Sequence, residues 1–380
     1  MNCLIIFSKK HTNPTQEASI VTMSRNAMNV CRSFSLCATF LLNLQAASAQ
    51  YNFTDLDNLL VQMTGQKKSR LGNKTATVIW KGEKIIYQKE TGDFKATTRA
   101  PIASASKWLT AALAMVMVEQ GKISLDDPVS NYLPIFRKYA KGYITIRHCL
   151  SNTTGLESEK NKFLEKIKFH SLEEEVNYFA SNKEINQNPG VEFRYGTIGL
   201  SIAGRVIEVV GKKSFDRLMQ EKLLRPLGMK NTTFANETMV DPSAGAVSTA
   251  NDYIKFLAML LNNGMINGKR ILSEESIKEM ETSQITPAMI KSTPKLTEGF
   301  TYGLGEWITE TDRNGNSVVI TSPGLYGTWP FIDNCRKYAC IVLTQDFLKE
   351  DSKETYLQIK DAIDTQLTAT CAESNVNSNK

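Results

Sequence analysis

Ser104 and Lys107 are the two residues whose types and spacing most readily suggest chemistry in this sequence. If a helix begins near Ser104, the two side chains lie on one helix face, because residues three apart are neighbours there. A serine hydroxyl is a weak nucleophile until a base takes its proton, and a lysine enclosed by apolar neighbours can act as that base. Ser-x-x-Lys also arises by chance, since serine commonly starts helices. The pair therefore indicates nucleophilic catalysis only with support from the rest of the chain.

The segment after Ser104 carries apolar residues at helical spacing, which predicts a helix that ends near Gly121. Further helices are predicted over 55–64, 144–155, 172–180, 198–210, 214–224, 252–261 and 352–367. Short β-branched and aromatic runs predict strands over 75–80, 84–88, 302–308, 317–321, 328–333 and 338–344.

Strands therefore cluster at both ends of the chain, and helices fill its middle. This order predicts an α/β (α+β) fold with one antiparallel sheet built from both chain ends, flanked by helices and interrupted by a helical insertion. The expected divisions are an α/β sheet domain from residues 50–125 and 235–370, a helical domain over 126–234, and a tail over 371–380.

Composition excludes several classes of function. The chain carries a net charge of +6, but its lysines are interleaved with acidic residues, so no nucleic-acid partner is expected. Histidine occurs only at 11, 148 and 170, which disfavours a Ser-His-Asp triad and a histidine-rich metal site. We expect neither a cofactor nor a metal.

The first 49 residues are predicted to be a leader and signal peptide. The start could be Met1, Met23 or Met28. Arg25 and Arg32 form a basic lead, and residues 34–44 form a short apolar core. Residues 47–49 follow as a small-x-small cleavage site. The apolar core is too short to span a membrane, so no stable membrane insertion is expected. The sequence predicts a periplasmic or secreted protein.

Four of the seven cysteines, at 149, 335, 340 and 371, follow the predicted cleavage site. No Cys-x-x-Cys pair occurs among them, which disfavours zinc and thioredoxin-like chemistry. Cys335 and Cys340 could face each other across a hairpin turn and form a disulfide in an exported protein. Free buried thiols are the alternative.

Five short motifs follow one another along the chain: Ser104-x-x-Lys107, Leu125-Asp126-Asp127-Pro128-Val129, Ser151-Asn152-Thr153-Thr154-Gly155-Leu156, Pro189-Gly190-x-x-Phe193-x-Tyr195 and Pro226-Leu227-Gly228-Met229. Together they resemble the β-lactamase-related serine hydrolases, which include class C β-lactamases, D-alanyl-D-alanine carboxypeptidases and family VIII-type esterases. The resemblance covers about residues 52–367. It implies a β-lactamase/transpeptidase-like fold and a small-molecule or peptide-like acyl substrate.

The resemblance also implies roles for individual residues. Ser104 corresponds to the nucleophile, Lys107 to its lysine partner, and Tyr195 to the tyrosine that exchanges protons with both. The backbone N–H groups of Ser104 and Leu325 correspond to the oxyanion hole. The family's Tyr-x-Asn corresponds to Tyr195-Gly196-Thr197, and its Lys-Thr-Gly or His-x-Gly strand to Ser322-Pro323-Gly324, so that Thr197, Ser322 and Gly324 are expected to bind substrate.

Two departures from the family pattern concern the substrate. Thr197 replaces an asparagine, and Ser322 replaces a cation that would meet the carboxylate of a penicillin or a peptide end. A charge-assisted hydrogen bond is about twice as strong as a neutral one, so the loss of this cation favours a neutral ester or amide. The alternatives are a class C-like β-lactamase or D-alanyl-D-alanine carboxypeptidase that uses Arg194 or Lys337 instead, and a binding protein without turnover.

Overall fold

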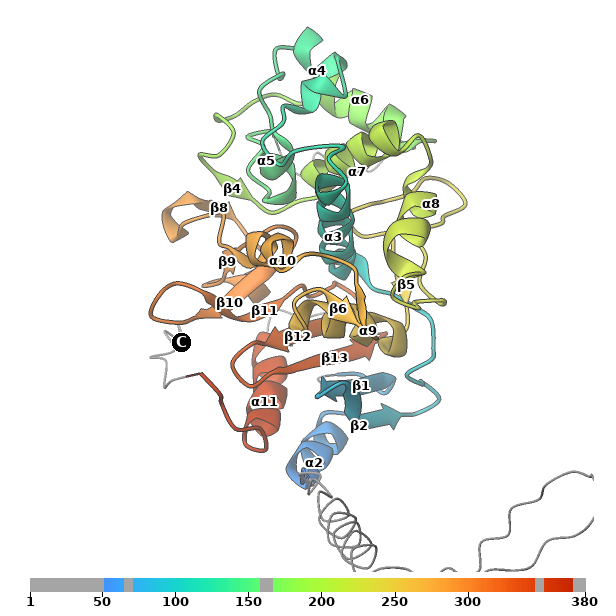
Figure 1. The fold of residues 1–380 in the computed structure, drawn as a ribbon, viewed down its shortest axis with the longest axis vertical. Helices are drawn as coiled ribbons and strands as arrows, with labels where there is room; N and C mark the ends of the chain where they lie inside the picture. Colours follow the sequence, from blue (N-terminus) through green and yellow to red (C-terminus); the bar gives the residue numbers. More distant parts are fainter. Residues whose placement is uncertain (1–50, 65–70, 158–166, 346–351, 372–380) are drawn as a thin grey trace, which may run out of the picture. The chain divides into compact units, whose positions relative to one another are not determined.

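A seven-stranded antiparallel sheet joins the two ends of the chain in the order β2-β1-β13-β12-β11-β10-β9. The computed structural model describes residues 51–64, 71–157, 167–345 and 352–371 (Figure 1). The strands are β1 (Thr75–Lys81), β2 (Lys84–Thr91), β9 (Thr301–Tyr302), β10 (Trp307–Thr311), β11 (Ser317–Thr321), β12 (Trp329–Asp333) and β13 (Tyr338–Thr344). The prediction of one sheet built from both ends is confirmed.

β13 explains why the sheet needs cover on both faces. Its seven residues, Tyr-Ala-Cys-Ile-Val-Leu-Thr, are all buried, and successive side chains in a strand point to opposite faces. One buried cluster contains Ala339, Ile341 and Leu343, and the second contains Tyr338, Cys340 and Val342. A strand that is apolar on both sides requires helices on both faces of its sheet.

Helices supply this cover (Figure 1). On one face α9 packs against β1, β12 and β13, and on the other face α2 and α11 pack against each other. The helices are α2 (Thr54–Met63), α3 (Ser106–Glu119), α4 (Ile135–Lys138), α5 (Ile146–Leu150), α6 (Leu172–Asn182), α7 (Ile198–Gly211), α8 (Phe215–Met219), α9 (Ala250–Leu261), α10 (Glu274–Glu281) and α11 (Ser352–Asp364).

Three short pairs of strands lie outside the main sheet. β3 (Ala100–Pro101) pairs with β5 (Val247–Ser248), and β4 (Phe193–Arg194) pairs with β8 (Ile290–Ser292). The third pair joins β6 (Met265–Ile266) to β7 (Lys269–Arg270). The first two pairs matter for function, because β3 leads into Ser104 and β4 leads into Tyr195.

The structure corrects several predicted boundaries. The run predicted as one strand over 302–308 divides into β9 and β10, because Gly303-Leu304-Gly305 turns the backbone and Gly305 has a φ of +78°. The helix predicted over 144–155 is shorter in the structure, where only Ile146–Leu150 (α5) are helical. The left-handed residue that ends α7 is Lys212, with a φ of +53°, and Gly211 is still helical. The helix predicted over 214–224 becomes α8 followed by a π-helix over Gln220–Leu224.

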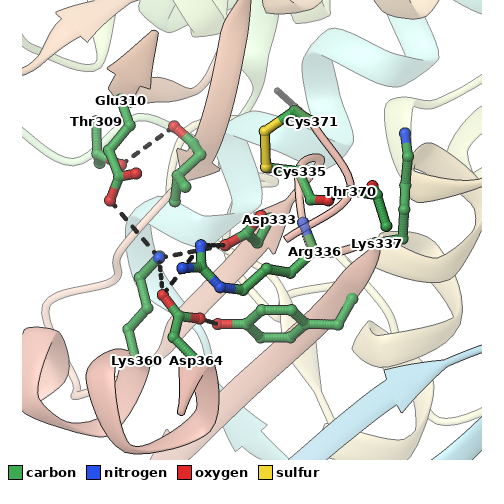
Figure 2. A network of polar contacts seen from close by, with 12 residues as sticks. Thr309, Glu310, Asp333, Cys335, Arg336, Lys337, Lys360, Asp364, Thr370 and Cys371 are labelled. Atoms are coloured by element: carbon green, nitrogen blue, oxygen red, sulfur yellow. Dashed lines mark hydrogen bonds and ion pairs between the residues drawn. A yellow bond between two sulfur atoms is a disulfide. The ribbon is translucent and has the colours of Figure 1, made fainter. Parts of the chain in front are cut away.

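The proposed pairing of Cys335 with Cys340 is wrong. Cys335 forms a disulfide with Cys371 (Figure 2). Cys340 and Cys149 are buried thiols, the alternative that the sequence left open. Cys340 lies within β13, and its side chain belongs to the cluster between the sheet and α2 and α11, so it points away from the turn that holds Cys335. The disulfide instead ties the chain beyond α11 to the turn between β12 and β13.

The predicted leader over 1–49 lies outside the described residues. The boundaries predicted at residues 125 and 234 stay a prediction. In the described part of the chain, no helix combines the length and the apolar character needed to span a bilayer.

Candidate active site

A strained turn presents Ser104 at the start of α3. Ser104 lies in a 3₁₀ turn over Ala103–Ala105, directly before the α-helix. Ala103 is buried and has a φ of +44°, an unfavourable value for a residue with a Cβ, and such strain is typical of functional sites. The Ile102 amide donates to the Ala246 carbonyl oxygen at 2.9 Å, which fixes the approach to the turn.

Ser104 and Ser106 have different environments although they are two residues apart. The Ser104 side chain is partly exposed, and its Oγ accepts a hydrogen bond from Lys107 Nζ at 3.2 Å. Ser106 is fully buried, and its Oγ accepts from the Ala246 amide at 3.0 Å. Of the two hydroxyls, the one at Ser104 can meet a substrate.

Lys107 is buried, and the described groups that contact its Nζ are neutral. Its side chain is 1% exposed, and Nζ donates to Ser104 Oγ and to the Ser243 carbonyl oxygen at 3.1 Å. Nζ also lies 4.9 Å from the centroid of the Tyr195 ring. No described acidic side chain lies within 4.0 Å of it. A lysine buried beside a hydroxyl without a carboxylate is suited to exchange protons with that hydroxyl.

Ser243 is a supporting residue that the sequence analysis missed. Its amide and its Oγ both donate to Asp241 Oδ1 at 2.7 Å, so a tight turn aims its carbonyl oxygen at Lys107. The Asp-Pro-Ser sequence at 241–243 is a turn signal that could have drawn attention to this loop.

Tyr195 is placed by the segment that follows β4. Its ring packs against Tyr302 and Trp307, with centroids 6.0 and 5.0 Å away. Asn152, with a φ of +57°, accepts from the Gly196 amide through Oδ1 at 3.2 Å and from the Arg194 amide through its carbonyl oxygen at 3.0 Å. Asn152 therefore fixes the backbone on both sides of Tyr195, a role that its place in the Ser-Asn-Thr-Thr-Gly motif did not reveal.

The end of β11 closes the site from the other side. A Cβ on Gly324 would collide with the Ile102 carbonyl oxygen, so only glycine allows this close approach to the turn that carries Ser104. Leu325 is 54% exposed. Within the residues the structure describes, neither the Leu325 amide nor the Ser104 amide donates to a backbone carbonyl, so both donors are available to an oxyanion.

The polar residues expected to bind substrate differ in their orientation. Thr197 is exposed at the start of α7 and makes no capping hydrogen bond. Ser322 is 2% exposed, and its Oγ donates to the Gly305 carbonyl oxygen at 3.2 Å and lies 3.4 Å from that of Ser104. This hydroxyl is directed into the protein behind Ser104, which differs from the expectation that it meets a substrate.

Neither cation considered for substrate binding is well placed. Arg194 lines a small pocket beside Gly196, but its Nη2 is paired with Glu192 at 2.9 Å. Lys337 lies in the turn between β12 and β13, at the far end of these strands from Ser322. A strand of five residues spans roughly 16 Å, so Lys337 is distant from Ser104.

The fold is that of a class of proteins in which a serine stands at the start of a central helix beside an antiparallel sheet. The model of the family described as Beta-lactamase matches residues 66–363, and the chain belongs to that family of serine hydrolases. The predicted β-lactamase/transpeptidase-like fold is thereby confirmed.

Similar structures and relatives agree with this assignment. A putative β-lactamase from Bacteroides dorei is 29% identical and superposes with a TM-score of 0.72, covering 82% of this chain and 99% of that one. The hydrolase EstCE1, described as having promiscuous acyltransferase activity, shares the fold at 21% identity with a TM-score of 0.68, covering 82% and 97%. Protein Rv1367c of Mycobacterium tuberculosis is 24% identical over 67% of this chain and 80% of its own length.

Proposed function

We propose that this protein is an exported serine hydrolase that forms an acyl-enzyme on Ser104 and acts on a neutral ester or amide. One observation carries the proposal. The buried Lys107 ammonium contacts the Ser104 hydroxyl and the Tyr195 ring, and among the described residues it has no carboxylate partner. Lys107 can therefore exchange a proton with Ser104 directly, and the proposal adds that the Tyr195 hydroxyl joins them when substrate binds, so that no histidine is needed.

The proposed reaction has two halves. Tyr195, with Lys107, takes the Ser104 proton while Oγ bonds to the substrate carbonyl carbon, and Tyr195 then donates the proton to the departing alcohol or amine. The Ser104 and Leu325 amides stabilise the oxyanion in between. Water then gives a proton to Tyr195 and attacks the acyl group, which leaves as a carboxylic acid when the Ser104 oxygen is protonated again.

The preference for a neutral substrate rests on the lack of a suitable cation in the described site. Ser322 offers no charge and its hydroxyl is engaged, and Arg194 is already paired. An apolar wall is expected at Leu325 and Tyr326. Trp329 is near in sequence but does not contribute to that wall, because it is buried and stacks on Tyr356 with centroids 4.3 Å apart.

Export is part of the proposal. The Cys335–Cys371 disulfide supports it, because disulfides persist mainly in oxidising compartments such as the periplasm or the exterior of the cell. The small-x-small sequence at 47–49 would supply the cleavage site.

Labelling with a fluorophosphonate tests the nucleophile. We expect the wild type and Ser106→Ala to be labelled and Ser104→Ala to be unreactive. Ser106→Ala is the matched control, since it removes a hydroxyl from the same turn and costs about 1–3 kcal/mol by leaving a buried amide unpaired. Labelling that persists in Ser104→Ala would overturn the assignment.

A substrate panel tests the substrate class. We expect hydrolysis of short-chain p-nitrophenyl esters and weak or absent hydrolysis of nitrocefin. The second candidate is a β-lactamase, which the matching family model and the Bacteroides dorei neighbour favour by their descriptions. Nitrocefin turnover that matches or exceeds ester turnover would replace the first proposal with the second.

A further inference from the structure

Glu306 is a carboxyl group enclosed in the protein directly behind α3. It has no exposed surface, and neither of its side-chain oxygens has a hydrogen-bond partner in the described part of the chain. It follows Gly305, where a Cβ would lie 2.7 Å from the Lys107 carbonyl oxygen. The backbone that carries Glu306 is thus in contact with the backbone that carries Lys107.

Three more buried polar groups near Glu306 also lack partners among the described residues. They are Trp108 Nε1, the Tyr302 hydroxyl and Asn152 Nδ2. Buried polar groups are rarely left unpaired, so several in one place call for an explanation such as an ordered water or a functional role.

In space, these four groups form a row in which each group is next to the following one. The Trp108 indole is close enough to Glu306 to act on the pKa of its carboxyl group, and Glu306 in turn acts on the pKa of Tyr302. Tyr302 also interacts with Asn152 and with Tyr195. The first member directly follows Lys107, and the last member holds the Gly196 amide directly after Tyr195. This row of groups therefore connects Lys107 to Tyr195 on the side that faces the protein interior.

The chemistry of the four groups is complementary if Glu306 is protonated. Burial raises the pKa of Glu306 well above its usual value, so the carboxyl group is neutral and offers one O–H donor and one carbonyl acceptor. The indole and amide N–H groups are donors, and a phenol can donate or accept. The other titratable groups that face Glu306 include Tyr253 from α9 and Glu281 from α10. Burial raises the pKa of Tyr253 well above its usual value and that of Glu281 to about 7, and a Glu281 that ionises above that pH raises the pKa of Glu306 further.

We propose that Glu306 is a positioning residue of the active site, whose neutral carboxyl group links Trp108 to Tyr302 and Asn152, with ordered water completing the link, and so fixes Lys107 relative to Tyr195. The inference rests on the proposed function of these two residues. Water is the natural completion, because it bridges polar groups that lie just beyond direct hydrogen-bonding distance.

Two substitutions test the link. Glu306→Gln keeps a neutral donor and acceptor of the same shape, so we expect kcat within about twofold of the wild type. Glu306→Leu fills the space but cannot link anything, so we expect kcat to fall about 10- to 100-fold with KM nearly unchanged, because small misplacements of reacting groups are costly. Thermal unfolding checks that both variants are folded, and rescue by glutamine separates positioning from simple packing.

Glu310→Gln is the matched control, since Glu310 is a second carboxyl group whose pKa is raised by burial but lies at the far end of β10. Its kcat should stay at the wild-type value. An infrared difference spectrum of the wild type minus Glu306→Gln at pH 7 should show the carbonyl band of a protonated carboxylic acid.

A Glu306→Leu variant with wild-type kcat, or a spectrum without that band, would overturn the inference. Fluorophosphonate labelling of the wild type keeps this result separate from the proposed function. If the wild type is unreactive, the proposed function fails. If it reacts, and Glu306→Leu reacts at the same rate, only the role of Glu306 fails.

Discussion

Two polar clusters lie at opposite ends of β11 and β12, and they are built on opposite rules. The far-end cluster consists of Glu310, Asp333, Arg336, Lys360 and Asp364 (Figure 2). Lys360 Nζ contacts Asp364 at 2.6 Å, Asp333 at 3.2 Å and Glu310 at 3.6 Å, and Arg336 contacts both aspartates. Every carboxylate in this cluster faces a cation.

In the near-end cluster, around Ser104, several buried polar groups lack a hydrogen-bond or ion-pair partner among the described residues. Lys107 has no acidic partner among the described residues, and the orphan groups of Asn152, Tyr302 and Glu306 lie close behind it. Unpaired buried groups cost stability, whereas paired ones hold their neighbours in place. The comparison teaches that the far end is arranged for stability, and that the near end has the arrangement expected of the proposed reaction site.

The largest expected effect is on turnover at the near end. Lys107→Ala and Tyr195→Phe should each lower kcat/KM by about 10²- to 10⁴-fold, the usual contribution of a general acid or base. The double variant should be little worse than either single one, because the two residues act as one proton-transfer unit. Steady-state kinetics with a p-nitrophenyl ester measures this. A large loss of stability in Lys107→Ala would break the comparison, since it would show that the near end is also a structural support.

Removal of Lys360, the central cation of the far-end cluster, should lower stability and leave turnover unchanged. Lys360→Met leaves Asp333 and Asp364 buried with only Arg336 to pair them, and breaking such a pair costs about 3–5 kcal/mol of unfolding free energy. Denaturant unfolding measures the loss, and kcat of the folded variant should be unchanged. Lys84→Met, at an exposed position on β2, is the control and should shift the unfolding free energy by less than about 0.5 kcal/mol. A drop in kcat for Lys360→Met would contradict a purely cohesive role.

The disulfide should add to this cohesion by a smaller amount. Cys371→Ser opens a link between residues 36 apart, and losing such a link costs about 2–4 kcal/mol. The thermal midpoint should fall while the activity at 25 °C stays the same. Equal midpoints for Cys371→Ser and the oxidised wild type would show that the link is not formed.

Glu281 lies between the two clusters and should give the smallest effect. Burial raises the pKa of Glu281 to about 7 from an ordinary 4.5, and Asn334 Nδ2 donates to it at 3.2 Å. The native state therefore holds this proton more tightly than the unfolded chain. The resulting stability is fully present below about pH 4.5 and is lost as the pH rises through about 7. Glu281→Gln should accordingly gain stability relative to the wild type between pH 5 and pH 8, as measured by thermal unfolding at both values. A constant difference between the two proteins would argue for an ordinary pKa.

Much of the fold was predictable because the strands of the sheet correspond to local runs of β-branched and apolar residues between turns. β11 and β13 have the predicted bounds, since each is a β-branched or apolar run between turn residues. The order of five motifs was enough to associate Ser104, Lys107 and Tyr195, which the structure brings together.

What the sequence did not reveal depends on contacts between distant segments. Cys335 pairs across 36 residues with Cys371, and no local pattern distinguishes that partner from Cys340. The Ser322 hydroxyl faces the carbonyl oxygen of Gly305, a direction fixed only when β11 packs on the β9–β10 turn. Glu306 looks like an ordinary charged residue until its burial is known.

The pairing of β1 with β13 also determines when the molecule can fold. Thr75 lies opposite Thr344, so β1 is synthesised long before β13, the strand that it pairs with on its inner side. At roughly 5–20 residues per second, a ribosome needs tens of seconds to bridge that interval. Until then β1 has an open edge beside its hairpin partner β2, and open edges invite pairing with other chains. We therefore expect the nascent chain to be most exposed to pairing with other chains until β13 has been synthesised.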